Sequence, residues 1–87
     1  MLSSSQIRAA RALLNISQTE LAKLSQVSTR TIARIETDEE EAMNANQKTI
    51  RKLKKTLEEA GIAFETNETE TTIRLKHDPK TEKNITK

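Results

Sequence analysis

Hydrophobic residues recur every three or four positions along most of the first sixty residues, which is the spacing of helices with one buried face. The first stripe consists of Ile7, Ala10, Leu13 and Leu14. The second consists of Leu21, Ala22 and Leu24. Ser17 and Glu20 have the spacing of a capping box, in which each side chain satisfies an unpaired amide at a helix start, and Ser3 and Gln6 repeat it. Because Asn tolerates the left-handed conformation that closes helices, Asn15 is expected to end the first helix.

The third stripe predicts a helix that Ser28 begins and that buries Ile32 and Ile35. Successive residues of a helix are about 100° apart, so Arg30 and Arg34 fall close to the side opposite Ile32. We therefore expect this helix to present two arginines outward.

A fourth stripe, formed by Ile50, Leu53 and Leu57, predicts a helix that Gly61 ends. Asn44 with Gln47, or Asn46 alone, can cap its start. The solvated face carries Lys48, Arg51, Lys52, Lys54 and Lys55. Beyond Gly61 the apolar and polar residues alternate over 62–66 and again over 71–75, which predicts two strands of a β-hairpin.

Composition limits the chain to one small core, because it has 87 residues, of which 33% are hydrophobic, and one Phe as its only aromatic residue. The predicted fold class is mainly α, a four-helix domain with a C-terminal β-hairpin. The domain takes residues 1–61 and the hairpin 62–77, and a polar tail, 78–87, is expected to be disordered.

The absence of Cys and the single His argue against disulfides and metal sites. Without a long apolar run or a signal-peptide core, we expect a cytoplasmic protein with no membrane contact.

The net charge of +2 conceals an uneven distribution. Residues 1–35 carry +4 and residues 47–60 carry +3, whereas residues 36–46 carry −5. Two basic blocks therefore flank an acidic patch.

The residues Gln18, Ala22, Ile32 and Glu36 resemble the pattern of the phage-repressor/Cro helix-turn-helix family. The resemblance runs from about Gln6 to Gly61 and is strongest between Ser17 and Glu36. It implies two helices that cross closely where Ala22 is small, with Ile32 beneath the crossing.

The resemblance also implies roles for individual side chains. The residues expected to meet base edges in the major groove are Thr29, Arg30 and Arg34. Those expected to hold phosphates are Gln18, Ser28, Thr31 and Arg8. Arg11 and Glu36 are expected to form a structural ion pair between the first helix and the end of the third. Each role has an alternative. Arg11 and Glu36 can form an exposed surface pair that contributes little to the stability of the fold. Arg30 and Arg34 can belong to an ordinary solvated helix face.

The chain departs from the family pattern at two places. Gln26 stands where the family usually has Gly, which costs about 1 kcal/mol or somewhat more if the turn keeps a left-handed residue there. The acidic run 38–41 stands where many members carry basic residues against the DNA backbone. Because four acids repel phosphates, we expect this loop to point away from DNA or to bind another partner.

These features favour a sequence-specific regulator that binds double-stranded DNA, most plausibly a repressor acting as a homodimer on a two-fold operator. The hairpin is the candidate dimerisation element, with Phe64, Ile73 and Leu75 as the residues that pairing would bury. The alternative is a hairpin that folds back on the fourth helix within one chain.

A second class of function is an antitoxin-like module that binds a protein partner as well as DNA, through the acidic loop or the C-terminal segment. An enzyme is not expected. His77 is the only His, and Gly61, the only Gly, cannot form a Gly-rich phosphate loop. No cofactor is implied.

Overall fold

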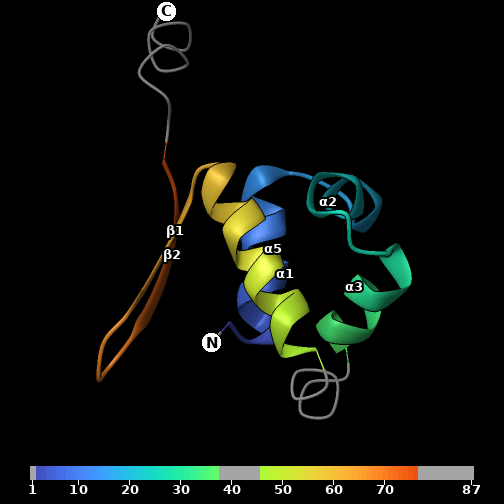
Figure 1. Cartoon of the computed structure of the whole chain (residues 1–87). Helices are drawn as coiled ribbons and strands as arrows, with labels where there is room; N and C mark the ends of the chain where they lie inside the picture. The colour runs from blue at the N-terminus through green and yellow to red at the C-terminus, as the bar shows by residue number, and fades with distance from the viewer. Residues whose placement is uncertain (1, 38–45, 77–87) are drawn as a thin grey trace, which may run out of the picture.

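The chain folds as four helices followed by a two-stranded antiparallel hairpin, as the computed structural model shows for residues 2–37 and 46–76 (Figure 1). The elements are α1 (Ser4–Leu14), α2 (Gln18–Ser25), α3 (Thr29–Thr37), α5 (Gln47–Glu59), β1 (Ile62–Thr66) and β2 (Thr71–Leu75). The predicted fold class is confirmed. The acidic run 38–41, Asn44, His77 and the tail 78–87 lie outside the described residues.

Local side-chain chemistry begins the first two helices as predicted. The Ser3 hydroxyl accepts a hydrogen bond from the Gln6 amide at 3.1 Å, and the Gln6 side chain accepts one from the Ser3 amide at 2.7 Å. Ser17 and Glu20 form the same box at 3.0 and 2.9 Å. Asn15 follows α1 in the left-handed conformation, with φ of 56°. Both capping boxes and the end of α1 are therefore confirmed.

One cluster of aliphatic side chains forms the core beneath the four helices and the first strand. Its buried members are Leu2, Ile7, Ala10, Leu21, Ile32, Ile35, Ile50, Leu53, Leu57 and Ile62. The predicted inward residues of α3 and α5 all belong to it. Burial of apolar surface in such a core stabilises the fold by about 25 cal/mol per Å². This burial is the main contribution that holds α3 against the other helices.

Two residues predicted to be buried are instead largely exposed, Leu13 at 43% and Leu24 at 59%. In α2 the buried residue beside Leu21 is Ser25, whose hydroxyl donates to the Leu21 carbonyl at 2.7 Å. Ser25 lies about 40° from Leu21 around the helix on one side, and Leu24 lies about 60° away on the other. Because α2 packs through the side that carries Ser25, Leu24 is left in solvent. Leu13 lies about 120° from Ile7 around α1, beyond the packed arc.

The hairpin pairs Ile62 with Leu75 and Phe64 with Ile73, and it begins directly after Gly61. Gly61 has φ of 114°, and a Cβ atom there would lie 3.1 Å from the Lys76 carbonyl oxygen. The close return of β2 therefore requires glycine.

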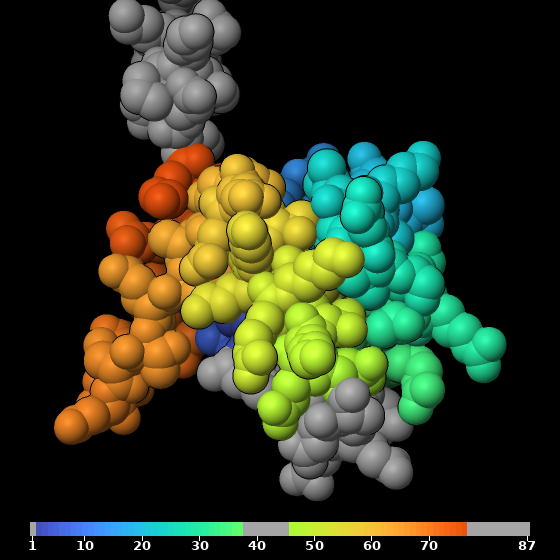
Figure 2. All heavy atoms as spheres, viewed as in Figure 1, coloured from blue at the N-terminus to red at the C-terminus, as the bar shows by residue number. Residues whose placement is uncertain are grey.

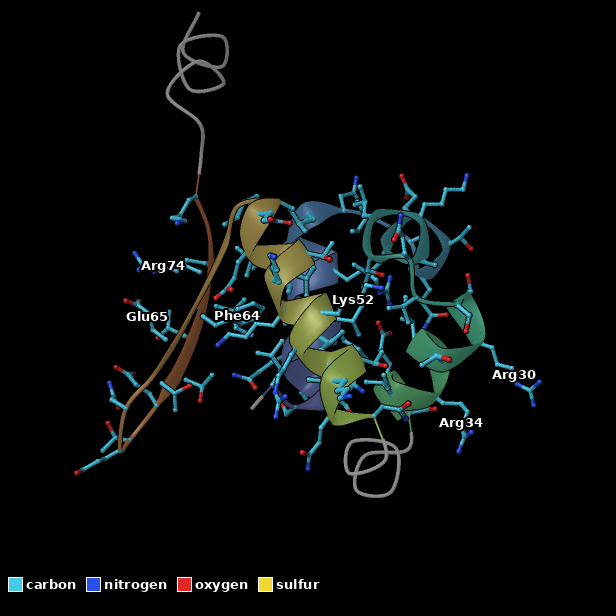
Figure 3. All side chains as sticks on the ribbon, in the orientation of Figure 1. Arg30, Arg34, Lys52, Phe64, Glu65 and Arg74 are labelled. Atoms are coloured by element: carbon cyan, nitrogen blue, oxygen red, sulfur yellow. The ribbon has the colours of Figure 1, made fainter. Side chains whose placement is uncertain are left out.

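The hairpin has one apolar and one polar face. Phe64, Ile73 and Leu75 are half-buried against the core, β1 beside α5 and β2 beside α1. Figure 3 shows Phe64 directed toward the helices, with Glu65 and Arg74 on the opposite face, where they form a 2.7 Å ion pair. Within one chain the hairpin thus folds back on the helices, the arrangement that the sequence left open as an alternative to dimerisation.

Among residues 2–37 and 46–76, no helix is long and apolar enough to cross a membrane.

Candidate nucleic-acid interface

The turn between α2 and α3 keeps the left-handed residue of a helix-turn-helix without having glycine. Gln26 follows α2 with φ of 60°, and the Val27 amide donates to the Ala22 carbonyl at 3.3 Å. Ser28 then begins α3. Its hydroxyl accepts from the Thr31 amide at 3.1 Å and donates to the Thr31 hydroxyl at 2.8 Å. The turn conformation is therefore retained in spite of the substituted glycine.

The outer face of α3 carries both predicted arginines. Arg30 and Arg34 are exposed, whereas Ile32 and Ile35 are fully buried on the other side. In Figure 3 both arginines extend away from the rest of the molecule, and Figure 2 shows α3, in green, standing out on the side opposite the hairpin. This face offers two cations to an acceptor surface without any rearrangement of the core.

Thr29 and Thr37 occupy different parts of α3. Thr29 is exposed, but it lies about 100° around the helix from Arg30, on the flank of the arginine face. Thr37 is exposed within about 20° of Arg30 and belongs to that face. The sequence reasoning missed Thr37, although the 100° spacing that located the arginines also locates it.

Glu36 lies at the centre of a polar cluster that joins the first three helices. Its side chain is 2% exposed and accepts two hydrogen bonds from Arg11, each of 3.0 Å, from Nε and Nη2. The Gln18 amide donates a third, also of 3.0 Å. A further nitrogen of Arg11 donates to the Ile16 carbonyl at 3.0 Å. The structure thus brings together the two residues of the expected ion pair and adds Gln18, which sequence reasoning had assigned only to phosphate.

Side chains from α1 also reach the last turn of α3. The Arg8 guanidinium donates to the Glu36 carbonyl oxygen and, at 3.2 Å, to the Ser5 hydroxyl. The buried Ser4 hydroxyl donates to the Ile35 carbonyl oxygen. The last carbonyls of a helix have no partner within the helix, so these contacts satisfy them and hold the C-terminal end of α3 against α1.

The four predicted phosphate contacts all have partners inside the chain. Arg8 and Gln18 bind the backbone and side chain of Glu36, and Ser28 and Thr31 bind each other. Gln18 donates one of its two amide hydrogens to Glu36, so the other is available. Their contacts with phosphate stay predictions.

The basic side chains of α5 are exposed, namely Lys48, Arg51, Lys52, Lys54 and Lys55. Lys52 extends toward the side of α5 that faces α3 in Figure 3.

In the described part of the chain, no group of three or more His, Asp or Glu side chains is placed to hold a metal ion.

A short α2, a tight left-handed turn and an α3 with an exposed cationic face define a helix-turn-helix DNA-binding domain. Residues 7–59 match the family model described as helix-turn-helix, of the Cro/C1 type. The chain belongs to the Cro/C1-type helix-turn-helix family, as its resemblance predicted. This is a family of DNA-binding regulatory domains and not of enzymes, and membership supports a DNA-binding transcription regulator. Comparison with curated proteins and with solved structures yields no match.

Proposed function

We propose that the chain is a repressor that binds double-stranded DNA sequence-specifically, as a homodimer on a two-fold operator. The observation that carries the proposal is the outer face of α3, where Arg30 and Arg34 are exposed on a helix whose opposite face is fully buried. A helix of this kind fits the major groove of B-DNA, which is about 12 Å wide. A repressor bound there blocks polymerase by occupying the site.

The contacts divide into base reading and positioning. Arg30 and Arg34, with Thr29 at the flank, meet base edges. Gln18 and Ser28 lie at the starts of α2 and α3, where free backbone amides favour an anion, and there they approach phosphates. Thr31 and Arg8 add to the phosphate contacts at the edges of this surface.

The proposed dimer joins two copies through the hairpin. A two-stranded sheet is marginal by itself, and addition of a symmetry-related strand completes it. The Lys76 amide donates to the Gly61 carbonyl and the Asn67 amide donates to the Glu70 carbonyl, so these backbone groups point toward the partner strand. The backbone groups at 62, 64 and 66, and at 71, 73 and 75, alternate with these and point away from the partner strand. Phe64, Ile73 and Leu75 gain further burial in such a dimer.

Binding of duplex DNA is tested by selecting sites from random duplexes and measuring their affinity by fluorescence anisotropy. We expect one enriched two-fold sequence and weaker binding by Arg30→Ala and Arg34→Ala. The matched control is Arg74→Ala, which removes an exposed arginine from the hairpin on the other side of the molecule. A chain that binds no duplex, even at low salt, is not a DNA-binding repressor.

The dimer is tested separately by sedimentation of the full chain and of a chain that ends at Gly61, with circular dichroism to check that the shorter chain keeps its helices. We expect a dimer for the first and a monomer for the second. Monomeric behaviour of both chains would exclude the hairpin dimer and leave the DNA proposal intact.

A further inference from the structure

Arg30 and Arg34 lie one turn apart on the same face of α3. Four residues turn a helix by about 400°, so the two side chains leave the axis within about 40° of each other. Both are exposed, and in Figure 3 they extend to the same side. The two guanidiniums therefore face one surface together.

Neither guanidinium makes a hydrogen bond or ion pair within the described part of the chain, in contrast to Arg8, Arg11 and Arg74. Contact with DNA therefore does not require either side chain to break a bond with another residue of 2–37 or 46–76. Within these residues, none of the five N–H donors of either group is used, so each can donate to an external acceptor.

The spacing of the two arginines matches a spacing along DNA. A helix rises about 1.5 Å per residue, so the positions are about 6 Å apart along α3. Base pairs are about 3.4 Å apart along the duplex, so a helix that lies along the groove spans about two steps between these side chains. The two arginines consequently face base pairs that are separated by one intervening pair.

An arginine fork matches the O6 and N7 acceptors of guanine in the major groove, and this pairing discriminates against other bases. We infer that each operator half-site contains two G·C pairs separated by one base pair, one read by Arg30 and the other by Arg34. The inference rests on the proposed function and names the DNA that this face recognises. Of the two side chains that flank the arginines, Thr31 is bonded to Ser28 and Ala33 offers only a methyl group, so the intervening pair is read weakly.

The first test is the sequence of duplexes selected by the full chain. We expect two G·C pairs with one pair between them in each half-site. Selection with Arg30→Ala and with Arg34→Ala should each lose the preference at one of these two positions and keep it at the other. Arg74→Ala should select the same sites as the unsubstituted chain, and circular dichroism checks that each variant is folded.

A second test assigns each arginine to its guanine by changing one acceptor. Replacement of a guanine by 7-deazaguanine removes N7 and leaves base pairing intact. We expect it to weaken binding roughly tenfold at either predicted position. The same replacement should have little further effect in the variant that lacks the corresponding arginine, because the two changes remove one interaction.

The outcomes separate this inference from the proposed function. Specific binding to half-sites without two G·C pairs at this spacing overturns the inference and leaves a DNA-binding regulator. Equal weakening of every sequence by both alanine variants also overturns it, because the arginines then contact phosphates. Failure to bind any duplex overturns the proposed function itself.

Discussion

At the scale of single residues, Glu36 shows how the position of α3 depends on one buried charge. Its carboxylate is removed from water and compensated by Arg11 of α1 and Gln18 of α2. Removal of a charge from water costs several kcal/mol, which the attraction offsets only when the geometry is good and the remaining acceptors are satisfied. The bidentate pair and the third donor meet this condition. Loss of one partner should therefore cost more than the pair itself contributes.

Arg11→Met is expected to lower the free energy of unfolding by about 2 to 3 kcal/mol, at the lower end for buried pairs, because the Arg11 side chain is 24% exposed. Urea unfolding measures the change. The control is Arg74→Met, which breaks the pair of Arg74 and Glu65, whose side chains are 57% and 61% exposed, and should cost less than about 1 kcal/mol. Equal losses of stability in the two variants would show that the burial of Glu36 does not increase the cost of losing its partner.

The left-handed turn residue provides a second residue-scale prediction. Gln26→Gly is expected to raise the free energy of unfolding by about 0.5 to 1 kcal/mol, because glycine adopts φ of 60° without the steric cost of a Cβ atom. Asn15→Gly is the matched control, since Asn tolerates this conformation, and it should change stability by less than about 0.5 kcal/mol. A destabilised Gln26→Gly would show that the Gln26 side chain contributes contacts that outweigh the backbone strain.

At the scale of elements, α2 shows the limit of reading a buried face from spacing. Leu21 and Leu24 both fit a helical stripe, yet only Leu21 is buried. The side of a helix that packs is determined by its neighbours, and in α2 it runs from Leu21 to Ser25 and not to Leu24. A buried serine is tolerated there because its hydroxyl returns to the Leu21 carbonyl.

Leu21→Ala is expected to lower the free energy of unfolding by about 2 to 5 kcal/mol, because it leaves a cavity in the core. Leu24→Ala makes the same chemical change in the same helix at a largely exposed position and should cost less than about 1 kcal/mol. Thermal and urea unfolding of the two variants test this contrast. A large loss at Leu24 would show that its side chain packs against the chain in solution.

At the scale of the whole molecule, α3 and the hairpin lie on opposite sides of the pair formed by α1 and α5 (Figure 1). The proposed DNA-reading face and the proposed dimer interface are therefore separate surfaces. A dimer joined through its hairpins carries its two α3 helices toward its ends, which favours two half-sites that are read independently and held at a fixed separation. Substitutions on one surface should leave the other unaffected.

This arrangement predicts that stability depends on protein concentration. If two copies pair through the hairpin, the midpoint of thermal unfolding should rise with concentration, because association stabilises only the folded chain. Arg30→Ala, which alters the opposite side, should show the same rise. A midpoint independent of concentration over a hundredfold range would contradict the dimer.

The parts of this fold that the sequence alone determined are those that depend on residues close together in the chain. Both capping boxes join residues three positions apart, and the left-handed residue after α1 depends on the tolerance of Asn15. The opposite placement of Ile32 and the arginines follows from the helical repeat. The assignment to the family followed from the same local pattern.

Only the tertiary structure decided which flank of each helix is covered and which distant partner a polar side chain meets. Leu13 and Leu24 are exposed because the neighbouring helices occupy other sides of α1 and α2. Gln18 binds Glu36 and Arg8 binds the end of α3 across 18 and 28 residues of chain. Such contacts depend on how the helices cross. The helical repeat places a residue on its own helix, but it carries no information about what lies opposite.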